Sequence, residues 1–228
     1  MIETWRWFGP KDKVTLSDIR QTGASGIVTS LYHLEPGIVW KKEEISSRLT
    51  EITGSKSQPT HLSWEVVESL PVSETIKTGS HPRDEHIKAW IESMENLSEL
   101  GINVICYNFM PILDWTRTEL AAPMSSGATA MYFDLLDFIA FDCFILERIN
   151  AQNDYEKHLV DKAKNRFESF STEKKLLLTK NITAGLPGAG ENLTFGEVKT
   201  RLEGYSGIDA DKLRENFKYF LDAVVPTA

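Results

Sequence analysis

The sequence predicts an α/β protein built on a parallel sheet, and three observations lead to this fold class. Short runs rich in β-branched and aromatic residues alternate with longer stretches that carry apolar residues at helical spacing. Four such short runs occur within residues 1–107, and glycine follows the helical stretches between them. Consecutive βα units form either a doubly wound sheet or a (β/α)8 barrel, and periodicity alone does not separate the two.

The first two units are marked by short strand signals and helix caps. Residues 4–8 predict the first strand, and Thr15 and Asp18 have the spacing of a capping box that begins the first helix. Residues 26–31 predict the second strand, and residues 41–53 predict an amphipathic second helix. The same strand and helix order has then occurred twice.

The third and fourth units follow the same order. Residues 62–68 predict a strand, residues 83–100 a helix, and residues 102–107 the fourth strand. The fourth strand is apolar and β-branched, so we expect both of its faces to be covered and the thiol of Cys106 to be buried. Cys143, in a predicted helix, is expected to be a second buried thiol, as in proteins of a reducing compartment.

The alternation ends after Thr118. Residues 119–206 predict a helix-rich insertion with no convincing strand. Helices are expected at residues 133–149, 154–170 and 171–184, and after a capping box at Thr194. An insertion of this length is usually functional, as a lid or an interface. We therefore expect a single partial domain over residues 1–228 that carries this insertion.

A last amphipathic helix begins at Asp209, with apolar residues on one face. These residues are Leu213, Phe217, Phe220, Leu221 and Val224. A crossover helix normally leads to another parallel strand, so we expect further strands beyond Ala228. The open strand edges would then need another chain or segment to cover them.

Composition and charge restrict the classes of partner. The chain has 33 acidic and 25 basic residues, a net charge of -8, and no basic stripe, so we expect no nucleic-acid partner. The N-terminal residues lack the pattern of a secretory signal, which favours a cytoplasmic location. Acidic residues interrupt the most apolar stretch, residues 133–149, so no membrane span is expected.

The segment that follows the fourth strand is the strongest candidate for a binding site. Asn108, Asp114, Trp115 and Arg117 offer an amide, a carboxylate, a flat apolar wall and a bidentate cation. This mixture suits a small polar anion. The alternative is that Arg117 forms only a surface ion pair with Asp114, because this spacing is common for such pairs.

Several segments of the chain resemble the mannonate dehydratase family. They are residues 4–9 (TWRWFG), 26–29 (GIVT), 67–72 (VESLPV) and, above all, 106–118 (CYNFMPILDWTRT), and the resemblance extends over the whole chain. It implies a TIM (β/α)8 barrel of the xylose-isomerase-like type, of which this chain would hold about the first four βα units and the insertion. It also implies a metal-dependent hydro-lyase, a carbon-oxygen lyase that uses Mn²⁺ or Fe²⁺.

The implied reaction removes water from D-mannonate to give 2-keto-3-deoxy-D-gluconate in glucuronate catabolism. The chain would bind the sugar acid and form a homo-oligomer. Two alternatives stay open: a catalytically inactive truncated barrel fragment, and a related metal-dependent sugar isomerase or epimerase. A clamp of Asp114 and Arg117 for an anion argues against a neutral sugar.

In a TIM barrel the functional groups lie at the carboxyl ends of the strands, which selects four groups of residues here. The candidates are Trp7 with Phe8, His33, Glu68 with Ser69, and Asn108. His33 could polarise a hydroxyl or exchange a proton near neutral pH, and Glu68 could bind a hydroxyl or accept a proton. The alternatives are a structural role for His33, a salt bridge for Glu68 and a loop contact for Asn108. Trp5, Trp64 and Trp90 are expected to pack in the core.

The chain departs from the family pattern at two single positions and in its lack of the family's metal ligands. Phe8 stands where members usually have Tyr, and Ser73 stands where they have His. The family's metal ligands, two His, a Cys and a late Asp, have no counterpart in residues 1–228. We therefore expect no metal ligand in this chain, and we expect the metal and the main acid and base groups to be supplied by sequence beyond Ala228.

Overall fold

The computed structural model describes residues 1–113, 115–185 and 193–228, and its chain divides into two compact units. Unit 1 comprises Met1–Pro111 and Gly207–Ala228, and unit 2 comprises Ile112–Ser206. The predicted insertion at residues 119–206 lies within unit 2. No helix in the described part of the chain combines the length and the apolarity needed to cross a bilayer.

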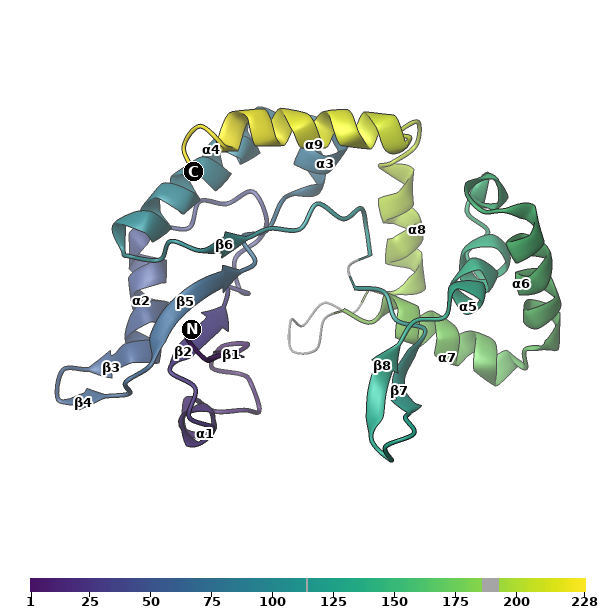
Figure 1. Ribbon diagram of the computed structural model, residues 1–228. Helices are drawn as coiled ribbons and strands as arrows, with labels where there is room; N and C mark the ends of the chain where they lie inside the picture. Colours follow the sequence, from purple (N-terminus) through teal and green to yellow (C-terminus); the bar gives the residue numbers. More distant parts are fainter. Residues whose placement is uncertain (114, 186–192) are drawn as a thin grey trace. The chain divides into compact units, whose positions relative to one another are not determined.

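Unit 1 is an α/β unit with a parallel sheet, which confirms the predicted fold class (Figure 1). Its elements are β1 (Thr4–Arg6), α1 (Leu16–Gln21), β2 (Gly26–Thr29), α2 (Lys42–Thr53), β3 (Gly54–Ser55), β4 (Gln58–Pro59), β5 (Ser63–Glu68), α3 (Glu74–Thr78), α4 (Arg83–Glu99), β6 (Ile105–Cys106) and α9 (Ala210–Val224). The four parallel strands lie in the order β1-β2-β5-β6, and β3 and β4 form a separate small hairpin. The order along the sheet therefore follows the order along the chain.

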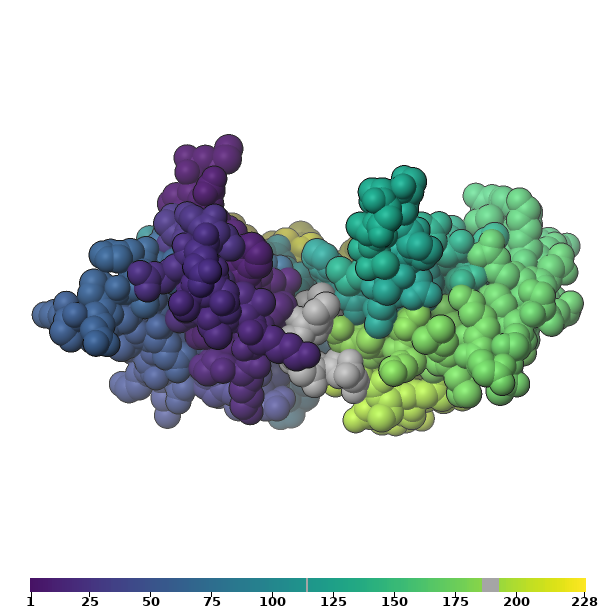
Figure 2. Space-filling view, turned by 90° about the horizontal axis from the view of Figure 1, so that it is seen from below, coloured from purple at the N-terminus to yellow at the C-terminus, as the bar shows by residue number. Residues whose placement is uncertain are grey.

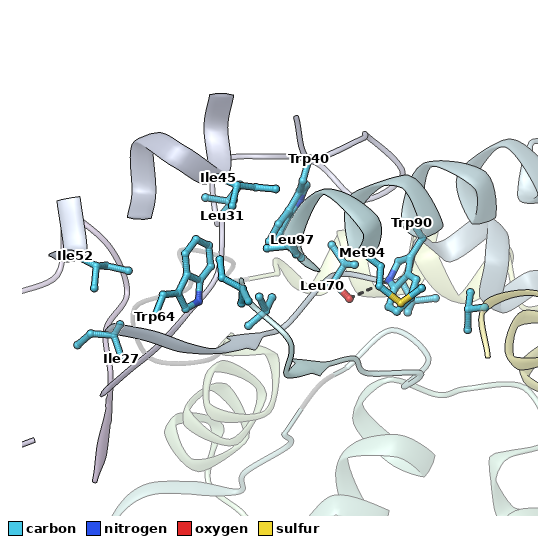
Figure 3. Packing of buried hydrophobic residues seen from close by; sticks show 14 of the residues in the cluster. Ile27, Leu31, Trp40, Ile45, Ile52, Trp64, Leu70, Trp90, Met94 and Leu97 are labelled. Atoms are coloured by element: carbon cyan, nitrogen blue, oxygen red, sulfur yellow. Dashed lines mark hydrogen bonds between the residues drawn. The ribbon is translucent and has the colours of Figure 1, made fainter. Parts of the chain in front are cut away.

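The core of unit 1 lies between the sheet and its helices, where α2 packs on β5 and α4 packs on α2 and α9. Trp64 from β5 and Trp90 from α4 are both buried there, as predicted. Figure 3 shows buried residues of the strands and helices directed toward one another, and Trp90 Nε1 donating a hydrogen bond to the carbonyl oxygen of Leu70, 3.3 Å away. Asn216 of α9 donates to the carbonyl oxygen of Lys77, at 2.9 Å, so the last helix is attached to α3.

The opposite face of the sheet is more open than the sequence predicted. Val104 is 52% exposed, and the thiol of Cys106 is exposed rather than buried. Trp5, in the edge strand β1, is 41% exposed rather than part of the core. The expectation that β6 is covered on both faces was wrong. An apolar, β-branched run is equally compatible with one covered face. Strand β6 pairs with β5 only at Ile105 and Cys106.

Unit 2 contains helices and one antiparallel hairpin (Figure 1). Its elements are β7 (Glu119–Pro123), β8 (Thr129–Tyr132), α5 (Leu135–Ala140), a π-helical turn (Phe141–Ile145), a 3₁₀ turn (Ala151–Asp154), α6 (Lys157–Ser169), α7 (Thr172–Thr183) and α8 (Phe195–Glu203). The expectation of no strand in residues 119–206 was wrong. Neither strand has a buried residue, since β8 is exposed throughout and only Glu119 and Ala122 of β7 are half-buried, so the strands carry no alternation of buried and exposed residues that a sequence pattern would show.

The predicted helix over residues 133–149 is shorter and starts later. Asp134 caps α5 by accepting hydrogen bonds from the backbone N–H groups of Leu136 and Asp137. The helix then widens into the π-helical turn, in which Asp142 is buried. Asp142 accepts hydrogen bonds from Arg148 Nε and Nη2 at 2.9 and 2.8 Å and from the Tyr155 hydroxyl at 2.7 Å. These bonds satisfy the buried carboxylate.

Candidate functional site

A cluster of polar groups lies at the carboxyl ends of the parallel strands in unit 1. Arg6 ends β1, Glu68 ends β5 and Cys106 ends β6, while Tyr32 follows β2. Because side chains alternate along a strand and Val67 is fully buried in the core, the neighbouring Glu68 projects to the open face of the sheet. Arg6 Nη1 lies 3.4 Å from Glu68 Oε1 and forms an ion pair with it.

Tyr32 is held against the same cluster. Its hydroxyl donates a hydrogen bond to the Glu68 carbonyl oxygen at 3.3 Å, and its ring lies 5.7 Å from the ring of Phe8. Burial raises the pKa of Tyr32, and the Glu68 carboxylate adds to this, although Arg6 opposes it. Tyr32 therefore acts as a neutral hydroxyl near neutral pH.

Cys106 is a weak nucleophile in this setting. Partial desolvation of the otherwise exposed sulfur and the charge of Glu68 raise the pKa of the Cys106 thiol above its usual value, with Arg6 acting in the opposite direction. A raised pKa keeps the sulfur as a thiol at neutral pH, and the thiolate is the reactive form. The group can donate a weak hydrogen bond, and it is poorly suited to covalent catalysis.

Arg6 keeps hydrogen-bonding capacity that the described residues do not use. Its guanidinium carbon lies 5.0 Å from the centroid of the Phe8 ring, and its Nε is buried with no acceptor among the described residues. A guanidinium presents donors in a plane that matches a carboxylate. Arg6, Tyr32 and Glu68 together can hold a molecule that carries both a carboxylate and hydroxyl groups.

Buried contacts fix the loops that carry this cluster. The buried Arg48 of α2 donates from Nη1 to the Ser30 carbonyl oxygen at 2.9 Å, and its guanidinium carbon lies 5.4 Å from the centroid of the Trp7 ring. Ser30 Oγ donates to the Ser69 carbonyl oxygen at 2.7 Å, and Thr29 Oγ1 donates to the Trp7 carbonyl oxygen at 2.6 Å. The ends of β1, β2 and β5 are thereby tied to one another before any ligand binds.

The other predicted site residues of unit 1 lie in three different environments. Trp7 is only 5% exposed and belongs to the core. His33 is about half exposed, and its Nε2 lies 2.9 Å from Glu44 Oε2, a surface pair. Asn108 is half-buried in the segment after β6. Their predicted contacts with a substrate stay predictions. Of the candidates predicted in unit 1, Glu68 pairs with Arg6, and Phe8 lies against Arg6 and Tyr32.

The remaining predicted residues belong to unit 2. Trp115 is exposed and has a positive φ of 47°. Arg117 is 5% exposed and donates from Nη2 to the carbonyl oxygens of Ala184 and Gly185, at 2.8 and 2.9 Å. Its Nε and Nη1 are buried and have no acceptor within the described ranges. Asp114 lies outside the described residues, so the predicted pair of Asp114 and Arg117 stays untested, although Arg117 itself is buried rather than at the surface.

Sequence reasoning missed Arg6 and Tyr32. The first strand was predicted to run to residue 8, which placed Trp7 and Phe8 at its end, whereas β1 ends at Arg6. A signal was present, because Arg6 is a cation at the end of a strand whose neighbours are aromatic. Tyr32 directly follows the predicted strand at residues 26–31, but His33 was predicted to be the site residue after that strand.

The described residues do not provide a set of ligands for a metal ion. Within residues 1–113, 115–185 and 193–228, no group of three or more His, Cys, Asp or Glu side chains is arranged to hold one. Of these residue types, Glu68 and Cys106 lie at the strand ends, and both are close to the positive charge of Arg6. These residues do not fit Mn²⁺ or Fe²⁺, which need several donors.

Comparisons with known proteins agree over the full length of the chain. A family model described as D-mannonate dehydratase (UxuA) matches residues 1–228. The mannonate dehydratases of Rhizobium meliloti (strain 1021) and Marinomonas sp. (strain MWYL1) are 45% and 46% identical over 228 residues. These matches cover 100% of this chain and 56% and 57% of the relatives.

A solved structure is similar as well. The mannonate dehydratase from Streptococcus suis serotype2 superposes with a TM-score of 0.68 at 30% sequence identity. The match covers 100% of this chain and 50% of that one. The chain thus spans about half the length of the relatives that it matches.

Proposed function

The chain belongs to the D-mannonate dehydratase family, and on that premise we propose that it takes part in the removal of water from D-mannonate to give 2-keto-3-deoxy-D-gluconate. The observation that carries the proposal is the family match over residues 1–228. The reaction class is that of a hydro-lyase, a carbon-oxygen lyase. The proposal includes a role in glucuronate catabolism in the cytoplasm and assembly with copies of the same chain.

The proposed fold is the first part of a TIM barrel of the xylose-isomerase-like type. The order β1-β2-β5-β6 supports it, because four parallel strands that follow one another without reversal are the pattern of a (β/α)8 barrel. A doubly wound sheet would place later strands on both sides of the first. In a barrel, the carboxyl ends of these strands form part of the mouth where substrates bind.

The cluster in unit 1 suits a sugar acid. We assign Arg6 to the carboxylate, because its planar donors match that group, and the Tyr32 hydroxyl and the Glu68 carboxylate to substrate hydroxyls. Trp7, His33 and Asn108 of the same unit are proposed as further substrate contacts from the family resemblance. Arg117, Trp115 and Asp114 are proposed separately as an anion-binding group of the segment after β6.

The chemistry requires a proton to leave the carbon beside the carboxylate, and hydroxide to leave the next carbon with help from an acid. The enol so formed becomes the 2-keto product when it takes up a proton. The described residues supply binding groups for this reaction, and His33 is the one proposed acid or base. Mn²⁺ or Fe²⁺ belongs to the proposal as the family's cofactor, with ligands from residues other than those described.

Of the alternatives, a related sugar isomerase or epimerase has no observation in its favour, because the relatives compared are named mannonate dehydratases. A catalytically inactive assembly of this chain is a second candidate. The observation that favours it is the lack of a metal-binding cluster within the described residues.

One experiment separates these possibilities. The intact mass of the natural protein is measured first, and the purified protein is then incubated with D-mannonate and Mn²⁺ or Fe²⁺ while the 2-keto-3-deoxy acid is quantified. Turnover supports the proposed function. A natural protein of 25.8 kDa that gives no product with either metal would exclude dehydratase activity and support the inactive assembly.

A further inference from the structure

Arg48 of α2 is a buried cation to which the proposed function assigns no role. Its side chain is 8% exposed, and its Nε lies 2.9 Å from the carboxylate of Glu51, which is 41% exposed. This contact is an ion pair without a hydrogen bond from Nε, which has no hydrogen-bond acceptor among the described residues. Burying a charge for such a pair adds little to the stability of a protein. The other contacts of the guanidinium therefore indicate its role better than its charge does.

The guanidinium of Arg48 contacts the segments that follow two strands. Its Nη1 donates to the carbonyl oxygen of Ser30, after β2, at 2.9 Å, and its central carbon lies 5.4 Å from the centroid of the Trp7 ring, after β1. Gly9 also lies close to it, since a Cβ added there would be 3.0 Å from Nη1. Gly9 has a φ of 89°, a conformation that glycine adopts readily. One side chain of α2 thus fits against both segments.

Ser30 extends this connection to a third strand end. Its side chain is buried, and Oγ donates to the carbonyl oxygen of Ser69, directly after β5, at 2.7 Å. The segments after β1 and β2 are also joined to each other, because Thr29 Oγ1 donates to the Trp7 carbonyl oxygen at 2.6 Å. Arg48 therefore connects α2, directly or through Ser30, to the segments after β1, β2 and β5.

The three side chains assigned to the ligand lie next to the residues that these contacts hold. Arg6 and Glu68 each directly precede a held residue, and Tyr32 lies two residues after one. Figure 2 shows that the first part of the chain, in purple, forms surface of unit 1 on the face in view, and the segments after β1 and β2 belong to that part. Surface segments are mobile unless contacts hold them. A displacement of about 1 Å is enough to impair a site.

We propose that Arg48 is a positioning residue of the candidate site, which does not contact the ligand but holds Arg6, Tyr32 and Glu68 in the arrangement that binds a sugar acid. A guanidinium suits this role, because it can lie against an aromatic ring and donate hydrogen bonds from its edge at the same time. The identity of the ligand rests on the proposed function, whereas the contacts of Arg48 do not depend on it. A role in stability alone would leave the affinity of the folded protein for its ligand unchanged.

The test measures the affinity of the purified chain for D-mannonate by isothermal titration calorimetry. Arg48→Met is expected to raise the dissociation constant by roughly tenfold, as the loss of a residue that supports a binding group commonly does. Arg83→Met is the matched control, because the guanidinium of Arg83 in α4 also lies against an aromatic ring, 3.7 Å from that of Tyr219. This control is expected to leave the dissociation constant unchanged. A folded Arg48→Met chain that binds D-mannonate as tightly as the wild type would overturn the proposal.

A second variant covers the case in which Arg48→Met does not fold, which circular dichroism shows. Arg48→Lys keeps the positive charge and a donor, but an ammonium cannot stack on Trp7 while it donates to Ser30. It is therefore also expected to raise the dissociation constant. If Arg48→Lys binds as tightly as the wild type, or if neither variant folds, Arg48 belongs to the stability of the fold and the proposal is wrong.

A second measurement separates the role of Arg48 from the identity of the ligand. The exposed thiol of Cys106 is alkylated with iodoacetamide over a range of pH, and mass spectrometry quantifies the modified Cys106 peptide. Partial desolvation and Glu68 raise the pKa of this thiol more than Arg6 lowers it. Loss of the arrangement in Arg48→Met should therefore move the midpoint of alkylation to lower pH, whereas Arg83→Met should not.

The two measurements fail in different ways. A wild-type chain that does not bind D-mannonate would count against the proposed function, and the alkylation of Cys106 would then decide the role of Arg48. A lower midpoint in Arg48→Met alone would support that role. The same midpoint in Arg48→Met and in the wild type would overturn it.

Discussion

At the scale of single residues, Arg6 combines a structural contact with unused donors. It pairs with Glu68, lies against the ring of Phe8, and keeps a buried Nε without an acceptor among the described residues. A buried donor without a partner is costly, and a ligand that accepts its hydrogen bond removes the cost. This reasoning favours Arg6 over the half-exposed His33 as the principal contact for an anion in unit 1.

Replacement of Arg6 should therefore affect substrate binding. We expect Arg6→Lys to raise the KM of the active protein for D-mannonate by roughly tenfold, because an ammonium cannot replace two coplanar donors. Steady-state kinetics measure the effect. Arg20→Lys, on the exposed part of α1, is the matched control and should leave KM unchanged. If Arg6→Lys also left KM unchanged, Arg6 would not contact the substrate.

Arg117 has a structural role that the structure shows and a binding role that stays a prediction. We expect Arg117→Lys to lower the free energy of unfolding by roughly 1–3 kcal/mol, because bonds to the buried carbonyl oxygens of Ala184 and Gly185 are weakened. Denaturant unfolding measures this change. If Arg117 also binds mannonate, the variant's KM rises as well. Lower stability with an unchanged KM would assign Arg117 to the fold alone.

At the scale of elements, Asp134 makes the stability of α5 depend on pH. Burial disfavours its charge, but hydrogen bonds from Arg166 and from the backbone N–H groups of Asp137 and Leu136 outweigh this and lower the pKa of Asp134. A carboxylate with a lowered pKa in the folded state contributes stability above its unfolded pKa, about 3.9. That contribution is lost as the pH falls through the lower folded value.

Asp134→Ala should accordingly destabilise the protein by about 1 kcal/mol at pH 7, which is the usual loss for a helix N-cap. The difference from wild type should shrink below about pH 4, because protonation then removes the same contribution from the wild-type chain. Urea unfolding at pH 7 and at pH 3 measures both values. Asp134→Asn keeps an acceptor at the cap without titrating, so it should lose less free energy of unfolding than Asp134→Ala. If the stability difference between Asp134→Ala and wild type were the same at pH 7 and pH 3, the assignment would be contradicted.

The sequence predicted the repeated elements of unit 1 better than the isolated ones. Buried strands and amphipathic helices follow periodic patterns, and Trp64 and Trp90 lie in the core as expected. The β7–β8 hairpin has no buried face, so it lacks the pattern that reveals a strand. The exposure of Cys106 was missed for a related reason, because an apolar run does not tell whether one or both faces of a strand are covered.

The candidate site was predicted only in part, because its geometry depends on where each strand ends. Glu68 was identified at the end of β5, whereas the end of β1 was placed two residues too late and Arg6 was overlooked. Strand boundaries are set by hydrogen bonds to the neighbouring strand, as in the pairing of Arg6 with Val28. A single sequence does not contain that register.

At the scale of the whole molecule, each unit has its own buried core. The core of unit 1 includes residues from both of its segments, since Phe220 and Val224 of α9 join those of the first segment. Unit 2 has two clusters, one around Ile139 and Ala163 and the other around Phe141 and Leu178. A continuous segment with its own core has what it needs to fold independently.

We expect residues 112–206, produced alone, to fold. The fragment should give a helical circular dichroism spectrum and should unfold in a cooperative thermal transition, because its buried clusters are formed by its own residues. Ala163→Asp, at a fully buried position, is the control and should abolish the transition. A fragment without a cooperative transition would show that unit 2 requires unit 1.

The division of unit 1 into two segments has a consequence for synthesis on the ribosome. Met1–Pro111 leaves the ribosome first, but α9, which supplies Phe220 and Val224 to its core, follows only after the whole of unit 2. At usual rates of translation, residues 112–206 take roughly 5–20 s to make, which is long compared with the folding of a small domain. Trp90, which packs edge-on to Phe220 at 5.2 Å, lacks that contact during the interval, although it still packs against Tyr107 of the first segment. Nascent unit 1 is therefore a candidate client for a chaperone that binds exposed aromatic surface until α9 is released.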